Sequence, residues 1–110
     1  MPTKEETYDQ AIKLHEDGNV EESVGKLHDL LQEDPDYALA HAALSVFYGK
    51  LEKHAQAVEH AQRVCDLEPE DPFSFVAMSL VCQKAGLLRE AEHALMQARQ
   101  AQAAAYQNEG

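Results

Sequence analysis

The amino-acid sequence predicts an all-α protein in which pairs of helices stack one after another. Apolar residues recur at spacings of three and four along most of the 110 residues, which places them on single helical faces. The pattern returns with a period of 34, the distance between Pro35 and Pro69, and two such periods separate Gly18 from Gly86. A fixed period of this length is typical of solenoids built from stacked repeats.

Capping residues and helix breakers delimit the first two helices. Thr3 and Glu6 have the spacing of a capping box, and Gly18 can adopt the left-handed conformation that ends a helix. Asn19, with an acidic residue three positions later, is expected to cap the second helix. Pro35 cannot continue a helix and disfavours helical geometry in the residue before it, so the second helix is expected to end near residue 33.

Similar signals delimit the remaining helices. Asp71 is a suitable N-cap, Pro72 suits the first helical position, and Gly86 marks the end of that helix. The last helix has no stop signal before Asn108 and is expected to be long. The expected helices span about residues 3–17, 19–33, 36–51, 54–67, 71–86 and 88–108.

Three columns of residues keep their character in each copy of the repeat. They are Ala11, Ser45 and Ser79; Ser23, Ala57 and Ala91; and Leu14, Tyr48 and Cys82. With the period and the closing prolines, these columns resemble the tetratricopeptide repeat, a helix-turn-helix unit of the same length. The middle copy carries the family pattern in Leu44, Ser45, Tyr48, Ala57, Val64 and Pro69. The resemblance implies a right-handed superhelical solenoid of six antiparallel helices, in one domain over residues 1–110 with repeats at about 4–37, 38–71 and 72–105.

The sequence departs from the family pattern at a few positions. Thr7 and His41 stand where the family prefers a large apolar residue, and Glu52 replaces the expected turn glycine. We expect these departures to affect local geometry without changing the fold. Arg99 is charged at the position that would face a further repeat, which predicts an array that is complete at three repeats.

Charge and composition restrict the class of partner. The formal net charge is −11, which disfavours nucleic acid and anionic membranes as partners. Residues 1–36 hold eleven acids and three bases, a net charge of −8, whereas nine acids and six bases in the rest of the chain give −3. The acidic first repeat is either a solvated face or a docking face for a basic partner. Because no apolar run is long enough to span a bilayer, a cytoplasmic protein is expected.

Nothing in the sequence predicts an enzyme, a cofactor or a metal site. Four of the six histidines recur at a constant interval that places them on different helices, and no pair has the HExxH spacing of zinc ligands. No P-loop, GxSxG or GxGxxG motif occurs. Cys65 and Cys82 lack metal-ligand spacing and are expected to be buried thiols. His41 is notable because its charge could change the packing at about pH 6.

The resemblance also implies where a partner binds. In this family the first helix of each repeat lines a concave groove, and most residues on the matching columns of this sequence are apolar. The predicted partner-binding residues are Tyr8, Ile12, Leu39, Val46, Lys50, Phe73, Val76, Leu80 and Lys84. The apolar side chains would supply contact area, and the two lysines would orient an acidic flank of the ligand.

The predicted function is a non-catalytic adaptor that binds an apolar peptide or an amphipathic helix of a partner protein. Three alternatives stay open: a groove filled by the last helix of the same chain, self-association into a homodimer through the groove or the last helix, and a shallow groove without a ligand. Family members that hold the C-terminal carboxylate of heat-shock chaperones use lysine, asparagine and arginine in the groove. The matching positions here hold Tyr8, Ile12, Ala43, Phe73 and Ala77, so that activity is expected to be absent.

Overall fold

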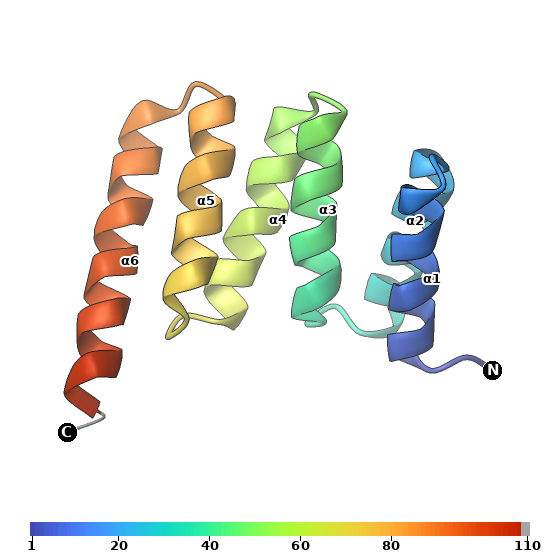
Figure 1. Cartoon of the computed structure of the whole chain (residues 1–110), viewed down its shortest axis with the longest axis horizontal. Helices are drawn as coiled ribbons and strands as arrows, with labels where there is room; N and C mark the ends of the chain where they lie inside the picture. The colour runs from blue at the N-terminus through green and yellow to red at the C-terminus, as the bar shows by residue number, and fades with distance from the viewer. Residues whose placement is uncertain (109–110) are drawn as a thin grey trace.

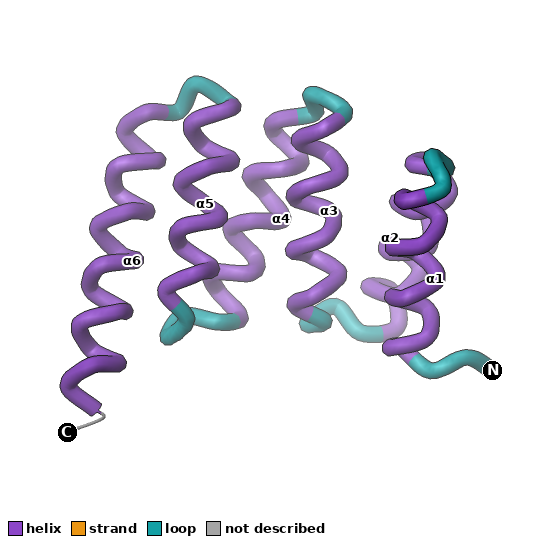
Figure 2. Tube along the Cα trace, in the orientation of Figure 1, coloured by secondary structure: helices purple, strands orange, loops and turns teal. Residues whose placement is uncertain are grey.

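The structure is a computed structural model that describes residues 1–108, and over that range the chain forms six α-helices joined by short turns (Figure 1). They are α1 (Lys4–Glu16), α2 (Val20–Glu33), α3 (Ala38–Lys50), α4 (His54–Leu67), α5 (Pro72–Lys84) and α6 (Leu88–Asn108). The turns alternate between the two ends of the helices (Figure 2), so consecutive helices run antiparallel. This arrangement confirms the predicted helical solenoid, whose helix bounds agree to within two residues. The predicted domain, 1–110, ends two residues outside the described range.

The N-terminal caps explain where two of the helices begin. The Thr3 hydroxyl accepts a hydrogen bond from the Glu6 backbone N–H at 3.1 Å, and the Glu6 carboxylate accepts one from the Thr3 N–H at 3.3 Å, which completes the predicted capping box. The Asp71 carboxylate accepts from the Phe73 N–H at 3.0 Å, as predicted for α5. Asn19 occupies the predicted N-cap position of α2, but its side chain makes no capping hydrogen bond. With ψ at 65°, Asn19 lies outside the extended conformation that directs an N-cap side chain at the first turn.

The turn inside each repeat has the same backbone conformation in all three copies. Gly18, Glu52 and Gly86 stand one repeat period apart and have φ values of 89°, 60° and 79°. The residue after each donates its N–H to the carbonyl five positions back, as from Lys53 to Tyr48 at 2.9 Å. Glu52, which replaces the expected turn glycine, therefore leaves the turn unchanged. Its side chain is strained there, because the left-handed conformation favours glycine.

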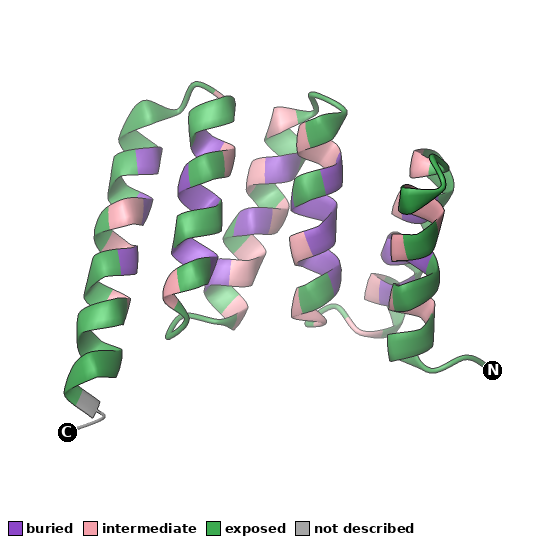
Figure 3. Cartoon of the chain, in the orientation of Figure 1, coloured by how far each residue is buried: buried purple, intermediate pink, exposed green. Residues whose placement is uncertain are grey.

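The helices of residues 1–108 pack around two separate apolar cores. The N-terminal core joins α1, α2 and α3 through Ala11, Leu27, Leu30, Ala40, Ala43, Leu44 and Phe47. The C-terminal core joins α4, α5 and α6 through Ala61, Cys65, Phe75, Met78, Cys82, Ala91, Ala94 and Ala98. Figure 3 shows these buried positions on the sides of the helices that face their neighbours. Both cysteines are buried thiols, as predicted, and burial raises the pKa of each.

Small buried side chains let the helices approach closely. The columns headed by Ala11 and Ser23 are at most 4 % exposed in all three repeats. The Ser23 hydroxyl also donates a 2.7 Å hydrogen bond across the helix pair to the Ala11 carbonyl. A larger residue in either column would separate the two helices of its repeat.

Polar aromatic side chains lie at the boundary of the two cores, where α2, α3 and α4 meet. This histidine seam consists of His28, His41, Tyr48 and His60. His41 Nε2 lies 2.8 Å from the Pro35 carbonyl oxygen and must donate to it, because that oxygen can only accept. In neutral His41 the other nitrogen, Nδ1, then accepts from Nδ1–H of His60 at 3.0 Å. The seam is thereby hydrogen-bonded with both imidazoles uncharged.

Burial and the neighbouring histidines oppose protonation of His60. Burial, followed by the charges that His41 and His28 would carry, lowers the pKa of His60 from 6.5 to about 4. With both imidazoles protonated, two N–H groups would face each other across 3.0 Å. His41 occupies a position where the family prefers a large apolar residue. It is only 6 % exposed, and its Nδ1 is the hydrogen-bond partner of His60.

Candidate partner-binding groove

Large apolar side chains remain exposed on one side of α3 and α5. They are Leu39 (54 % exposed), Val46 (51 %), Phe73 (78 %), Val76 (36 %) and Leu80 (53 %). All five belong to the predicted partner-binding set. The same helices also bury apolar residues in the two cores, such as Leu44 and Met78. α3 and α5 therefore carry more apolar surface than the packing of the solenoid uses.

Equivalent residues on α3 and α5 form three levels along the groove. The two helices lie side by side and run in the same direction, because each opens its repeat of an antiparallel array. The levels are Leu39 with Phe73, Val46 with Leu80, and Lys50 with Lys84. At a rise of about 1.5 Å per residue, the two apolar levels are about 10 Å apart and the lysines lie about 6 Å farther along.

A cavity of about 190 Å³ lies between α3 and α5 at the lysine end of the groove. It is lined by Ser45, Val46, Gly49, Lys50, His54, Ala57, Ala77, Leu80, Val81 and Lys84. Four of the predicted partner-binding residues thus surround one cavity, and most of its other lining residues are small. Its size suits an inserted side chain of a partner protein.

Tyr8 and Ile12 lie on the predicted groove columns of α1 but are half-buried. Both pack against the N-terminal core, and the Tyr8 ring lies 6.3 Å from the ring of Tyr37. Burial, with a smaller contribution from Asp9, raises the pKa of Tyr8. These two side chains therefore offer a partner less area than their counterparts on α3 and α5.

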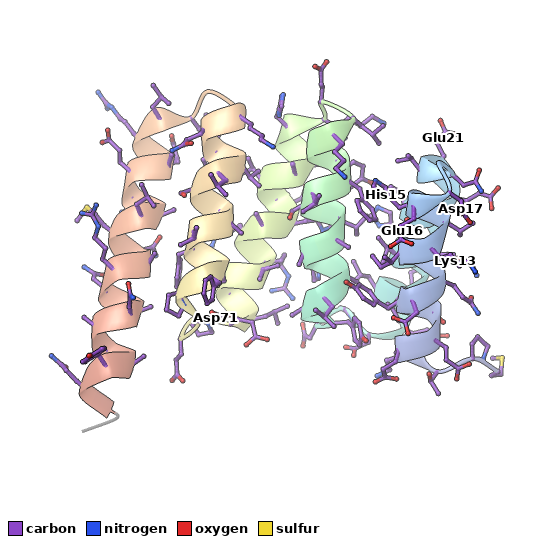
Figure 4. The ribbon with its side chains drawn as sticks, in the orientation of Figure 1. Lys13, His15, Glu16, Asp17, Glu21 and Asp71 are labelled. Carbon is purple, nitrogen blue, oxygen red and sulfur yellow. The ribbon has the colours of Figure 1, made fainter. Side chains whose placement is uncertain are left out.

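His15 also faces the second repeat. Its ring stacks on Phe47 of α3 with centroids 3.8 Å apart and an angle of 3° between the ring planes. Figure 4 shows His15 on the side of α1 that faces α3. His15 stands one repeat period before Gly49, but its stacking contact depends on how α1 packs against α3, which periodicity does not specify.

Sequence reasoning also missed a contribution from α6. A second hollow, of about 240 Å³, is lined by Pro72, Phe73, Val76, Leu95, Ala98, Arg99 and Gln102. The hollow lies between α6 and the first turns of α5. Phe73 and Val76 therefore border both this hollow and the groove. The spacing of Leu95, Ala98 and Gln102 by three and four already indicates that they share one face of α6.

Other kinds of site are not evident in the part of the chain that the structure describes. Within residues 1–108, no three histidine, cysteine, aspartate or glutamate side chains are grouped to hold a metal ion. No helix of the same range is long and apolar enough to cross a membrane.

Comparison with known proteins identifies the fold. No family model and no curated protein matches the chain. Among solved structures, MamA matches with a TM-score of 0.85 at 17 % sequence identity, over 96 % of this chain and 61 % of that one. The chain therefore spans about three fifths of the MamA chain.

Two further structures show the same arrangement of helices with a partner named. One is the second TPR of Spaghetti (RPAP3) bound to the HSP90 peptide SRMEEVD, with a TM-score of 0.77, 18 % identity, and coverage of 86 % of this chain and 88 % of that one. The other is the CopN–Scc3 complex, with a TM-score of 0.80, 20 % identity, and coverage of 86 % and 56 %. With six helices over residues 1–108 that follow the repeat period of the sequence, the protein has the tetratricopeptide-repeat fold.

Proposed function

We propose that the protein is a non-catalytic adaptor that binds an apolar peptide or an amphipathic helix of a partner protein in the groove. The observation that carries this proposal is the set of five exposed apolar side chains on α3 and α5. They belong to two neighbouring helices and not to loops, so a ligand would meet them without ordering a connecting segment. A cytoplasmic location, expected from the sequence, belongs to the same proposal.

The energetics of burial support this function. Covering one valine, leucine or phenylalanine side chain contributes about 1.5–3 kcal/mol. A partner helix that covers several of them could offset the association cost, about 4–15 kcal/mol. Structures with the same fold are named as bound to a peptide and as part of a protein complex, which favours the same kind of role here.

A displayed library of helical peptides, panned against the chain, tests the proposal. Recovered peptides are expected to carry apolar residues at spacings of three, four and seven, and Leu80→Glu is expected to abolish their binding by placing a charge in the groove. Leu88→Glu is the matched control, because Leu88 is an equally apolar, 64 % exposed residue on α6 outside the groove. Recovery of no peptide, or equal loss of binding in both variants, would contradict the proposal.

Self-association is the second candidate. Besides the groove, Leu88, Met96 and Tyr106 of α6 are more than half exposed, so a second copy has apolar surface to cover. Light scattering over about a tenfold concentration range measures the mass directly. A dimer that Leu80→Glu dissociates would make the groove an interface between copies, whereas a monomer throughout leaves the groove open to another protein.

A further inference from the structure

The lysine end of the groove has a charge opposite to that of the chain. The protein holds 20 acidic and nine basic residues. Among the described residues that line the 190 Å³ cavity, however, there are two lysines and no acid. The ion pairs between side chains of residues 1–108 are Lys4–Asp34 and Arg63–Asp36, so neither Lys50 nor Lys84 is engaged in one. Two exposed lysines therefore stand at one cavity, and neither has an ion-pair partner among residues 1–108.

Helix capping does not require this arrangement. A cation in the last turn of a helix is favourable, and both lysines stand in last turns. The equivalent position of the first repeat is Glu16, the last residue of α1 (labelled in Figure 4). Since α1 ends in the same turn with an acid there, the turn forms without a lysine. A lysine at this level is therefore not needed to form the turn, and in the second and third repeats it places an exposed cation beside the groove.

The helix dipoles indicate the orientation of a ligand. α3 and α5 both end at the lysine level, which puts their negative ends there. A ligand helix that runs antiparallel to them brings its positive N-terminus to this level. An acidic residue is most favourable in the first turn of a helix. The dipoles and the lysines therefore favour the same arrangement.

We propose that the ligand of the groove is an amphipathic helix that lies antiparallel to α3 and α5 and sets an acidic side chain of its first turn between Lys50 and Lys84. The proposal rests on the proposed adaptor function and specifies the chemistry of its partner. The spacing of the three levels along α3 and α5 sets the spacing of the matching residues in the ligand. These are an acid, an apolar residue four positions later, and a second apolar residue seven positions after that. The first apolar residue meets Val46 and Leu80, and the second meets Leu39 and Phe73.

Two synthetic helices of identical composition test this proposal. Both are acetylated, amidated and fluorescently labelled, with two leucines seven positions apart. The first carries glutamate four positions before the leucine pair and the second carries it four positions after. Fluorescence anisotropy titrations at about 0.05 M and about 0.5 M sodium chloride measure both affinities. The first probe is expected to bind about three- to tenfold more tightly at low salt, with the difference reduced at high salt.

Matched variants connect the preference to the cavity. Lys50→Gln and Lys84→Gln are each expected to remove most of the advantage of the first probe. Lys53→Gln changes the net charge by the same amount close to Lys50 in the chain, but Lys53 does not line the cavity, so the advantage is expected to persist. Circular dichroism of each variant verifies that the helices are intact.

Each outcome distinguishes the two proposals. Equal binding of both probes overturns the assignment of the acidic residue and leaves the adaptor function standing. Tighter binding of the second probe overturns the antiparallel orientation. If Lys53→Gln removes the advantage of the first probe as fully as Lys50→Gln and Lys84→Gln do, the preference comes from net charge, and the role of the cavity is overturned. If neither probe binds, the adaptor function itself fails, and the inference fails with it.

Discussion

The first helices of the three repeats occupy equivalent places in the solenoid but present different surfaces. On α1 the groove columns hold Glu5, half-buried Tyr8 and Ile12, and a terminal Glu16. On α3 and α5 the equivalent columns hold exposed apolar residues followed by lysine. Residues 1–36 also carry a net charge of −8, from eleven acids and three bases. The backbone register thus sets where the columns lie, and the side chains decide which repeats expose apolar surface.

The largest effect is expected from a leucine on the buried side of the first repeat. Leu27→Ala removes a fully buried side chain from the N-terminal core and is expected to lower the free energy of unfolding by about 2–5 kcal/mol. Leu80→Ala, in the exposed groove, should cost less than about 1 kcal/mol. Urea denaturation measures both. Equal losses would mean that Leu80 is part of the folded core, which would remove the contrast between the two regions.

A pH titration tests the junction between the first repeat and the others. Because the pKa of His60 is lower in the folded chain, the unfolded chain binds more protons between pH 6.5 and about 4. Stability is therefore expected to be full above pH 6.5 and to fall toward pH 4, by about 1–2 kcal/mol after screening at a half-buried site. Urea midpoints across this range should show a shallower slope in His60→Gln. His93→Gln, on the exposed part of α6, is the control, and an unchanged slope in His60→Gln would contradict the assignment.

The turn at residue 52 distinguishes the middle repeat from its neighbours. Glu52→Gly is expected to raise the free energy of unfolding by about 1 kcal/mol, because glycine adopts the observed φ of 60° without a steric penalty. Gly18→Ala at the equivalent turn should lower it by a similar amount. Thermal unfolding of both variants checks the signs. A destabilised Glu52→Gly would show that this side chain has a stabilising contact that outweighs the backbone strain.

The smallest effect is expected from making the first repeat resemble the others. Glu16→Lys places a cation in the last turn of α1, where it should add about 0.3–1 kcal/mol of stability through the helix dipole. It also extends the lysine level across all three repeats. If the inferred acidic ligand is correct, the probe with the N-terminal glutamate should bind about twofold more tightly to this variant at low salt. Weaker binding would indicate that the acidic first repeat takes part in recognition.

The helices and the groove columns were predictable because they depend on local signals and on the repeat period. Pro35, Gly18 and the Thr3 capping box place helix ends to within two residues. The exposure of Leu39 and Phe73 follows from their equivalent positions in adjacent repeats. That these side chains bind a partner stays a prediction.

The contacts between helices were less predictable. His41 and His60 are on different helices, and the 3.0 Å contact between their Nδ1 atoms depends on how far α4 slides along α3. Tyr8 is half-buried because Tyr37, in the connection before α3, packs beside it. Periodicity identifies the face of a helix on which a residue lies, but it gives neither the axial offset of two helices nor the path of a connecting segment.

The separation into two cores has a consequence for how the protein unfolds. In a solenoid each unit contacts only its neighbours, so cooperativity depends on the interfaces between units. The first repeat takes part in the N-terminal core alone, and it meets the second repeat through α3 and through the histidine seam, where His28 of α2 lies against Tyr48 and His60. We expect the first repeat to open as a cooperative unit of its own, with amide hydrogen exchange of α1 and α2 decoupled from that of α5 and α6 as the pH falls. Acid would then release the acidic first repeat from a groove region that stays folded.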